Sequence, residues 1–376
     1  MKKHSEELSK LLDFYYKKNV HFKDGKIFNS MCTAPLPYTK KIYIKFIESN
    51  LGNPLLYTGT KEMHDILINE LKKVMHLKGG YGYLTSGGTE GNITSLWIAR
   101  NYTKKTKVLL TKTAHFSILK AINLLGMKGE YVKVNDQYQM DIEDLKEKLD
   151  DNTACIVTSA GSTELGIIDP IEKISDIAED KFIVHVDAAF GGFVIPYLSH
   201  LKKYKFDFSL KSVKTLLADF HKMGMAPVPS SVLLLRNQKM MESIKFETPY
   251  LSANYNYTLL GTKPSGAVAA SYAALYLLGE NGYKEIVNRC WKNTLYMKNK
   301  LEKLGIKPII DPIMNIITAK TKNSKKIQEN LYKKGYYVSL VKDPPGLRFV
   351  IMPHIKKVHI DHLINELEKN LHLFND

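Results

Sequence analysis

Cysteine is scarce in this 376-residue chain, and no long uninterrupted run of apolar residues occurs. The three cysteines, Cys32, Cys155 and Cys290, are odd in number and lack the C-x-x-C spacing of redox and zinc motifs, so we expect reduced thiols. No stretch of about 18 apolar residues is present, which predicts no membrane-spanning helix. The opening residues MKKHSEELSK are not followed by the apolar region of a signal peptide. These absences predict a cytoplasmic protein with no membrane partner.

Arginine is also rare, although the net charge is +16. The basic residues are 50 lysines and only four arginines, Arg100, Arg236, Arg289 and Arg348. Proteins that read nucleic-acid bases favour arginine for its planar, bidentate guanidinium. The lysines are scattered along expected helices, as in KKIYIK and NELKKV, without a dense block. This pattern indicates a solvated basic surface rather than a nucleic-acid site, although a positive field could attract an anionic substrate or cofactor.

Apolar strands and amphipathic helices alternate through most of the chain. Strands are expected at YGYLT, KVLLT, EYVKVN, TACIVTSA, KFIVHVDAA, VKTLLAD and SSVLLLRN, with helical patterns between the earlier ones. Such alternation predicts an α/β fold with a mainly parallel sheet covered by helices on both faces. Ligands of such sheets bind beyond the carboxyl ends of the strands.

Three regions are expected along the chain. Residues 1–50 form an N-terminal helical segment that could pack on the C-terminal lobe, residues 51–282 a large domain, and residues 283–376 a small C-terminal α/β domain. Two long helices are expected near the boundary, one through about residue 280 and another over 283–304.

A glycine-containing turn, TSGGTEGN (85–92), follows the strand YGYLT and precedes a helix. Gly87 and Gly88 allow close approach of the backbone to an anion, Thr89 supplies a hydroxyl, and the helix presents free N–H groups. This combination suits a phosphate. The alternative is an ordinary strand-to-helix turn with Thr89 as the N-cap.

A carboxylate ends another apolar strand in FIVHVDAAFGG (182–192). Asp187 would be buried, and a buried carboxylate without a partner is costly. The partner could be a protonated ring nitrogen, a nearby lysine, or the N–H groups of the following turn. The small residues Ala188 and Ala189 would leave room for a flat ring.

A lysine lies between an apolar strand and a loop in ADFHKMGMAP (218–227). In a partly dry site, the pKa of Lys222 would be lowered, and its amine could form a Schiff base. A solvated loop lysine is the alternative. The order of phosphate turn, aspartate-ended strand and His221-Lys222 loop favours the first interpretation.

These segments resemble the group II pyridoxal-5′-phosphate (PLP)-dependent amino-acid decarboxylases of aspartate-aminotransferase-type fold (fold type I), and within them the archaeal L-tyrosine/L-aspartate decarboxylases. HVDAAFGG and HKMG together are highly specific. The other matching segments are NLGNPLLYTGT, TSGGTEGN, TAHFS, GSTELGIID, LGTK and LRFVIMPH, so the likeness spans nearly the whole chain.

The resemblance implies that PLP is the cofactor and that Lys222 carries it as a Schiff base. Asp187 would pair with the pyridinium nitrogen, His115 would stack on the ring, Ala189 would pack beneath it, and Thr163 would lie near its phenolic oxygen. The remaining implied positions bind the cofactor phosphate: Gly87, Gly88, Thr89 and His221 from one subunit and Gly261 and Thr262 from its neighbour. The resemblance therefore also implies a homodimer with active sites at the subunit interface.

Two further roles concern the substrate. The family uses a tyrosine of a mobile loop as proton donor, and the segment 248–261 offers Tyr250, Tyr255 and Tyr257, of which we favour Tyr255 or Tyr257. Packing or surface positions are the alternative for each. Arg348, in LRFVIMPH, would bind the substrate α-carboxylate through a bidentate guanidinium. A structural ion pair is its alternative.

The resemblance implies α-decarboxylation of L-tyrosine to tyramine or of L-aspartate to β-alanine, products that would feed methanofuran or coenzyme A synthesis. A different PLP-dependent carbon–carbon lyase, similar to sphingosine-phosphate lyase, is the second hypothesis. The third is a basic nucleic-acid-binding protein, whose affinity would fall steeply with salt. No metal site is expected.

Overall fold

A seven-stranded sheet forms the centre of the larger part of the molecule in the computed structural model, which describes residues 2–249 and 253–375. The strand order is β1-β7-β6-β5-β4-β2-β3. Five neighbouring strands run parallel, and β7 is antiparallel to both β6 and β1. The strands are β1 (Tyr81–Thr85), β2 (Lys107–Thr111), β3 (Lys128–Val132), β4 (Thr153–Ser159), β5 (Ile183–Asp187), β6 (Val213–Asp219) and β7 (Ser231–Leu235). The predicted mainly parallel α/β fold is confirmed.

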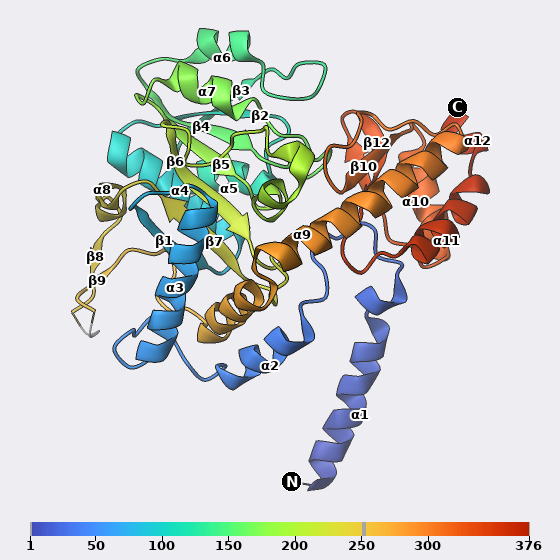
Figure 1. Cartoon of the computed structure of the whole chain (residues 1–376), viewed down its shortest axis with the longest axis horizontal. Helices are drawn as coiled ribbons and strands as arrows, with labels where there is room; N and C mark the ends of the chain where they lie inside the picture. The colour runs from blue at the N-terminus through green and yellow to red at the C-terminus, as the bar shows by residue number, and fades with distance from the viewer. Residues whose placement is uncertain (1, 250–252, 376) are drawn as a thin grey trace.

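Helices cover both faces of this sheet (Figure 1). One apolar core joins the sheet to α4 (Gly88–Thr103), α5 (Phe116–Leu124) and α8 (Gln238–Glu242). A larger core on the other face includes α3 (Thr58–Val74), α6 (Ile142–Lys148), α7 (Ile171–Ala178) and the first part of α9. The central strands are buried on both faces, because every residue of β4, β5 and β7 is buried rather than every second one.

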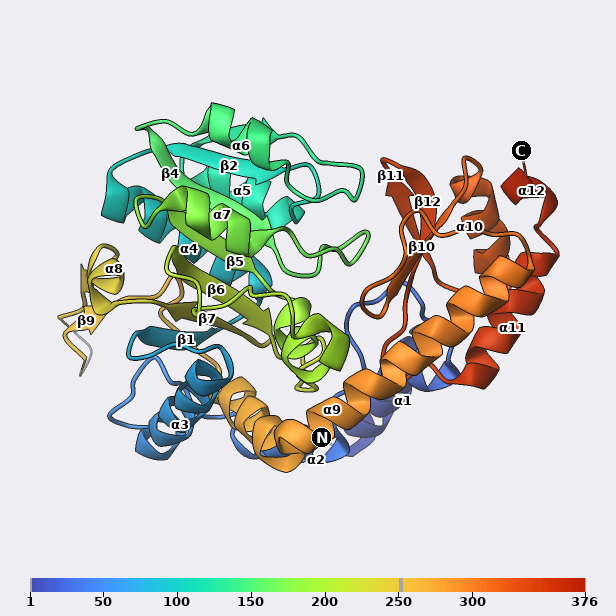
Figure 2. The ribbon, with the colours of Figure 1, turned by 45° about the horizontal axis from the view of Figure 1, so that its top comes forward.

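A kinked helical element, α9 (Ser265–Lys303), links the large sheet to a second, smaller layer (Figure 2). The two helices predicted in this region correspond to its two parts, which meet at Gly279, where φ is 51° and ψ is −166°. A positive φ interrupts the helical path, and glycine adopts it without the steric cost of a side chain.

The smaller layer is an antiparallel sheet of order β10-β12-β11, formed by β10 (Ile316–Lys320), β11 (Ser339–Lys342) and β12 (Pro345–Val350). Its helices α10 (Ser324–Lys333), α11 (Lys357–Glu368) and α12 (His372–Asn375) follow in the same part of the chain. It has an apolar core separate from those of the large sheet, to which the end of α9 contributes Met297 and Leu301.

The N-terminal region divides into two parts. Phe28 is fully buried in the core of the small sheet, and α2 (Pro37–Lys45) packs against α9. In contrast, α1 (Lys2–Lys18) projects from the body, and every side chain from His4 to Val20 is exposed (Figure 1). The expected packing on the C-terminal lobe is therefore wrong for α1 within one chain, because nothing in the described chain covers its apolar residues.

Short elements complete the chain. They are the 3-10 helices η1 (Phe22–Asp24), η2 (Gly191–Phe193), η3 (Ile195–Tyr197) and η4 (Ser199–Leu201), and the hairpin of β8 (Phe246–Glu247) and β9 (Tyr255–Asn256). Among the described helices, none combines the length and the apolarity needed to cross a membrane.

The turn after β5 packs tightly against the end of β4. A Cβ atom at Gly191 would lie 2.0 Å from the carbonyl oxygen of Ala160, and the amide of Gly191 already donates to that oxygen at 3.0 Å. Because the contact is to backbone, no side-chain rotation can relieve it. Gly191 therefore fixes the path of the chain directly after Asp187.

We expect Gly191→Ala to destabilise the protein by at least about 1–3 kcal/mol, the usual cost of overpacking, because the new methyl group must displace backbone. Gly59→Ala is the matched control, since a Cβ at Gly59 on exposed α3 would meet nothing within 4 Å. It should raise the free energy of unfolding by about 0.5–1 kcal/mol, because alanine has the higher helix propensity. Denaturant unfolding measures both, and equal effects of the two substitutions would contradict the argument.

Candidate active site

A cavity of about 170 Å³ opens at the carboxyl ends of the parallel strands. Asp187 ends β5, Ser159 ends the neighbouring β4, and Asp219 ends β6 on the other side. The complete lining is Met31, Gly88, Thr89, Asn92, Thr113, His115, Ser159, Gly161, Ser162, Thr163, Asp187, Ala189, Phe190, Asp219, His221 and Lys222. The cavity thus brings together most of the residues that the sequence singled out, and it lies where open α/β sheets bind ligands.

Asp187 is buried to 8% exposure and accepts two hydrogen bonds. The side-chain amide of Asn92 donates to its Oδ2 at 2.9 Å, and the backbone N–H of Ala189 donates to its Oδ1 at 3.1 Å. Donors to both oxygens stabilise the ionised form of a carboxylate. Asp187 therefore presents a fixed negative charge to the cavity, as a cationic ring nitrogen requires.

A buried chain of hydrogen bonds supports Asp187 from behind. The Asn92 side-chain amide also donates to Ser117 Oγ at 2.8 Å, and its carbonyl oxygen lies 2.8 Å from Nε2 of His185. His185 Nδ1 lies 2.8 Å from the hydroxyl of Thr215. Burial lowers the pKa of His185 to about 4, so the imidazole is neutral at pH 7, with its proton on Nε2 to serve the Asn92 carbonyl. A neutral His185 orients Asn92 without competing for the charge of Asp187.

His115 is the N-cap of α5 and belongs to the same chain of hydrogen bonds. Its Nδ1 lies 2.7 Å from Ser117 Oγ and 3.3 Å from the Ser117 amide, so Nδ1 is the acceptor and the proton of the neutral ring is on Nε2. Burial lowers the pKa of His115, against the opposing effect of nearby Asp187. A neutral imidazole therefore faces the cavity, as stacking on an aromatic ring requires.

Lys222 lies between the two strand-end carboxylates. Its Nζ is 2.9 Å from Asp219 Oδ2. Burial lowers the pKa of Lys222, but attraction to Asp219 and then to Asp187 outweighs this effect, so the pKa lies above its ordinary value. The expected lowered pKa is therefore wrong for the chain without a cofactor, because the burial that was anticipated comes with two carboxylates.

His221 is held by the backbone of Ser230 and approaches the same carboxylate oxygen of Asp219 as Lys222 does. Its Nδ1 donates to the Ser230 carbonyl at 2.7 Å, and its Nε2 lies 3.5 Å from Asp219 Oδ2. The ring is thereby fixed with Nε2 beside the carboxylate of Asp219 and at the wall of the cavity.

The start of α4 lies at one end of the cavity, which Gly88 and Thr89 line. Gly87, the N-cap, has φ 152° and ψ 167°, a region of backbone space that only glycine adopts easily. The first N–H groups of α4 have no partner within the helix and carry partial positive charge. Thr89 lies within the first turn rather than at the N-cap, so the alternative of Thr89 as a capping residue is wrong.

Thr163 lines the cavity, and its carbonyl accepts from Arg348 at 2.5 Å. The Arg348 guanidinium, which comes from the small sheet, also donates to the Asn29 carbonyl at 2.8 Å and to Ser339 Oγ at 3.0 Å. Burial lowers the pKa of Arg348 to about 10, so the group stays charged at pH 7. Its Nε is buried and has no hydrogen-bond partner among the described residues. Arg348 thus lies directly behind the cavity wall, in contact with no carboxylate.

The loop residues lie elsewhere in this chain. Tyr255 is partly exposed beneath the Nζ of Lys245, and together with Tyr257 it lines a second hollow beside Lys263. Gly261 and Thr262 are exposed. None of the four lines the cavity around Lys222, and Tyr250 lies outside the described residues.

Asn92, Ser117, His185 and Asp219 were not identified from the sequence as site residues. Asn92 is the last residue of the quoted turn TSGGTEGN, where it reads as an ordinary helical position. Asp219 could have been found, because it ends an apolar strand just as Asp187 does. Across the described chain no cluster of side chains suits a metal ion.

The donor set of the cavity fits pyridoxal phosphate. A fixed carboxylate suits a cationic ring nitrogen, free N–H groups at the start of a helix suit a phosphate, and a lysine lies between them. Ala189 leaves space beside Asp187 for a flat ring.

Comparisons with known proteins agree with this geometry. Residues 57–316 match the family described as "Pyridoxal-dependent decarboxylase conserved domain". The chain is 41% identical to a probable L-tyrosine/L-aspartate decarboxylase of Methanococcus aeolicus, over 97% of this chain and 98% of the relative. It is 39% identical to a probable L-aspartate decarboxylase of Archaeoglobus fulgidus, over 95% and 97%.

Among solved structures, the sphingosine-1-phosphate lyase of Burkholderia pseudomallei has a TM-score of 0.89 at 20% identity, over 99% of this chain and 91% of that one. This likeness supports fold type I. The family match covers more than half of the chain, and the sequence identities extend over nearly all of it. The chain therefore belongs to the pyridoxal-dependent decarboxylase family, whose cofactor is pyridoxal 5′-phosphate.

Proposed function

We propose that the protein catalyses PLP-dependent α-decarboxylation of an L-amino acid, L-tyrosine to tyramine and/or L-aspartate to β-alanine. The observation that carries this proposal is the placement of Asp187 and Lys222 on one small cavity beside the first turn of α4. Had these two side chains faced different cavities, the proposal would have failed.

The bound cofactor supplies an electron sink for the pair of electrons left at Cα when CO₂ departs. Asp187 would keep the ring nitrogen protonated, with Asn92 holding its Oδ2. His115 would cover one face of the ring, and Ala189 would lie against the other. Lys222 would hold the cofactor covalently, and Thr163 would lie beside its phenolic oxygen. The proposed phosphate-binding residues are Gly87, Gly88, Thr89 and His221, with Gly261 and Thr262 contributed by a second subunit.

Arg348 is the proposed partner of the substrate α-carboxylate. Its guanidinium is charged, lies directly behind Thr163 and has its Nε unpaired in the described structure. Two of its present acceptors are backbone carbonyls, which a carboxylate can displace because a charged acceptor binds a guanidinium more strongly. A side chain held this way would select an amino acid by its carboxylate and align the bond to be broken.

The lining of the cavity bears on which substrate side chain it would accept. Met31 and Phe190 offer apolar lining, which suits the ring of tyrosine. Apart from Lys222 and the two histidines, no cationic group lines the cavity in the described part of one chain, so aspartate would need Arg348 or a residue of a second subunit. The names of the relatives include both substrates.

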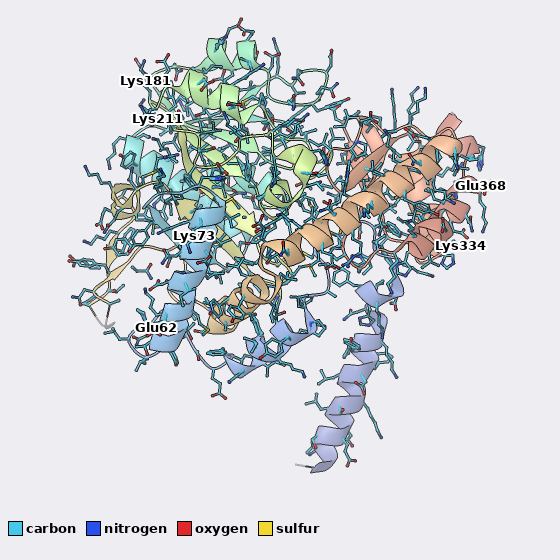
Figure 3. All side chains as sticks on the ribbon, in the orientation of Figure 1. Glu62, Lys73, Lys181, Lys211, Lys334 and Glu368 are labelled. Carbon is cyan, nitrogen blue, oxygen red and sulfur yellow. The ribbon has the colours of Figure 1, made fainter. Side chains whose placement is uncertain are left out.

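The alternative of a sphingosine-phosphate-lyase-like enzyme rests on a structural likeness at 20% identity, which supports the fold alone. Such an enzyme would need a second phosphate-binding group beside the cofactor site. The nucleic-acid alternative rests on the net charge of +16 alone. Figure 3 shows Lys73 and Lys334 on different parts of the molecule, whereas Lys181 and Lys211 lie near each other.

We propose a homodimer whose active sites lie at the subunit interface. The cavity lacks the loop residues expected to complete it, and α1 exposes apolar residues that a second copy could cover. Leu8, Leu11, Leu12 and Tyr15 follow helical spacing and are each about half exposed. We also propose a cytoplasmic location and retain the division into residues 1–50, 51–282 and 283–376, with α9 crossing the last boundary.

Lys222→Ala should remove both the visible absorbance of the lysine-bound cofactor and all CO₂ release, because no other amine lines the described cavity. Mass spectrometry of the protein incubated with each of the twenty amino acids identifies the substrate, and we expect tyramine or β-alanine as product. Lys173→Ala, on the exposed side of α7, is the control and should leave absorbance and turnover unchanged. A colourless wild type after incubation with PLP would contradict the assignment.

Arg348→Lys should lower kcat/KM by roughly 10- to 150-fold, the equivalent of one lost charged hydrogen bond. Lysine keeps the charge but cannot form the bidentate pair. Cofactor retention, measured by absorbance after dialysis, should change little. Equal loss of cofactor and of turnover would instead indicate a purely structural arginine.

Leu8→Ser combined with Leu12→Ser should shift the protein from dimer towards monomer in sedimentation experiments, because the two leucines supply apolar area on the same face of α1. Lys10→Ser on the same helix is the control and should leave the dimer intact. A dimer of unchanged stability in the double variant would show that α1 does not contact the partner.

A further inference from the structure

Asp219 is a second buried carboxylate at the cavity, with a side-chain exposure of only 2%. Its Oδ2 accepts from Lys222 Nζ at 2.9 Å and lies 3.5 Å from His221 Nε2. Its Oδ1 is buried and has no hydrogen-bond partner in the part of the chain that the structure describes. A buried charged oxygen without a donor is unfavourable, so it indicates a missing ligand atom or a missing proton.

The unpaired carboxylate lies at the end of the cavity where α4 begins. A Cβ atom built on Gly88 would be 3.1 Å from both carboxylate oxygens of Asp219. Gly88 is the first residue of α4, where the free N–H groups point towards a phosphate. A phosphate of about −1.5 to −2 charge would therefore approach an ionised carboxylate, which strongly favours protonation of one of the two anions.

The Lys222 ammonium is the present counterion of Asp219. When Lys222 is bound covalently to the cofactor, its nitrogen is no longer a free ammonium available to this carboxylate. Asp219 then loses its cation at the same time as an anion arrives next to it. Loss of the cation and arrival of the anion both favour the protonated form of Asp219.

We propose that Asp219 takes up one proton from solvent when PLP binds, and that the resulting neutral carboxylic acid donates a hydrogen bond from Oδ1 to the cofactor phosphate. The carboxylate gains the proton, no other bond is made or broken at Asp219, and the site thereby gains a donor in place of a repulsive charge. This inference rests on the cofactor site proposed above and assigns a role to a residue that the family resemblance did not supply.

The other charged and titratable groups around Asp219 are Lys222, His221, His115, Cys32 and, across the cavity, Asp187. His115 accepts through Nδ1 and is neutral, and burial raises the pKa of the Cys32 thiol, so neither supplies a positive charge. His221 and the cofactor phosphate itself are the competing acceptors of the proton, since Nε2 of His221 faces Asp219 while its Nδ1 is committed to Ser230.

Equilibrium binding of PLP to the full chain, measured across pH for the wild type and Asp219→Asn, tests the proposal. The amide donates permanently and carries no charge, so it imitates the protonated acid at every pH. We expect the ratio of the wild-type to the variant dissociation constant to rise by up to about tenfold per pH unit between the pKa of Asp219 without PLP and its higher pKa with PLP, and to level off above that range, where the variant binds more tightly. The substitution also removes a carboxylate that raises the pKa of Lys222, but this effect is common to PLP and to pyridoxal, which lacks the phosphate.

Pyridoxal is therefore the matched ligand. For pyridoxal the ratio between wild type and variant should vary much less with pH, since the repelling anion is missing. Asp219→Ser, which is also an uncharged donor, repeats the test if the asparagine variant folds poorly.

Each other result has a definite meaning. A ratio that does not change with pH would overturn the proposal and assign the proton to His221, to the cofactor phosphate or to no group. Weaker PLP binding by Asp219→Asn at every pH would also overturn it, since the ionised carboxylate would then be required. The same pH-dependent ratio for pyridoxal would exclude the phosphate contact. Failure of the wild type to bind PLP at all would reject the cofactor site itself.

Discussion

The negative charge of Asp187 is the constraint on which the rest of the site depends. A carboxylate at 8% exposure stays ionised only if donors reach it, and the structure supplies them from Asn92 and from the Ala189 backbone. The Asn92 amide is in turn oriented by His185, which burial keeps neutral. The geometry of one buried acid therefore extends through β5 into α4 and α5. Residues far from any ligand, such as Thr215, are part of the same arrangement.

Two acids at neighbouring strand ends perform different tasks because their surroundings differ. Asp187 has two neutral donors and keeps its charge, whereas Asp219 depends on a single ammonium and has one oxygen without a donor. The same residue type is thus surrounded by neutral donors in one place and by a single cation in the other. The difference follows from hydrogen bonding rather than from burial, since both are buried.

The sequence predicted the fold and much of the cavity because both depend on local patterns. Apolar strands ended by Asp187 and the His221-Lys222 loop are visible as short segments, and parallel strands bring their carboxyl ends to one edge. The supporting residues could not be found this way. Asn92 and His185 are 93 positions apart and meet only when α4 packs on β5. The predicted lowering of the Lys222 pKa was wrong for the same reason. The pKa depends on how close Asp219 and Asp187 come to Lys222, and the sequence does not show these distances.

The apolar face of α1 is exposed, and Tyr255 and Gly261 lie outside the lining of the cavity around Lys222. The predicted role of Gly261 involves a second subunit, so the fold of one chain does not bring it to the cavity. At the domain boundary, in contrast, the sequence predicted two helices, and α9 has a non-helical residue, Gly279, between its two helical parts.

Arg348 belongs to the small antiparallel sheet, yet its strongest contact is with the carbonyl of Thr163 beside the large one. One guanidinium therefore connects the small sheet to Thr163 in the wall of the cavity. If the carboxylate of a bound substrate replaces the Thr163 carbonyl, Arg348 exchanges its contact with the large domain for a contact with the substrate. The same movement of Arg348 would then both bind the substrate and change the contact between the two lobes.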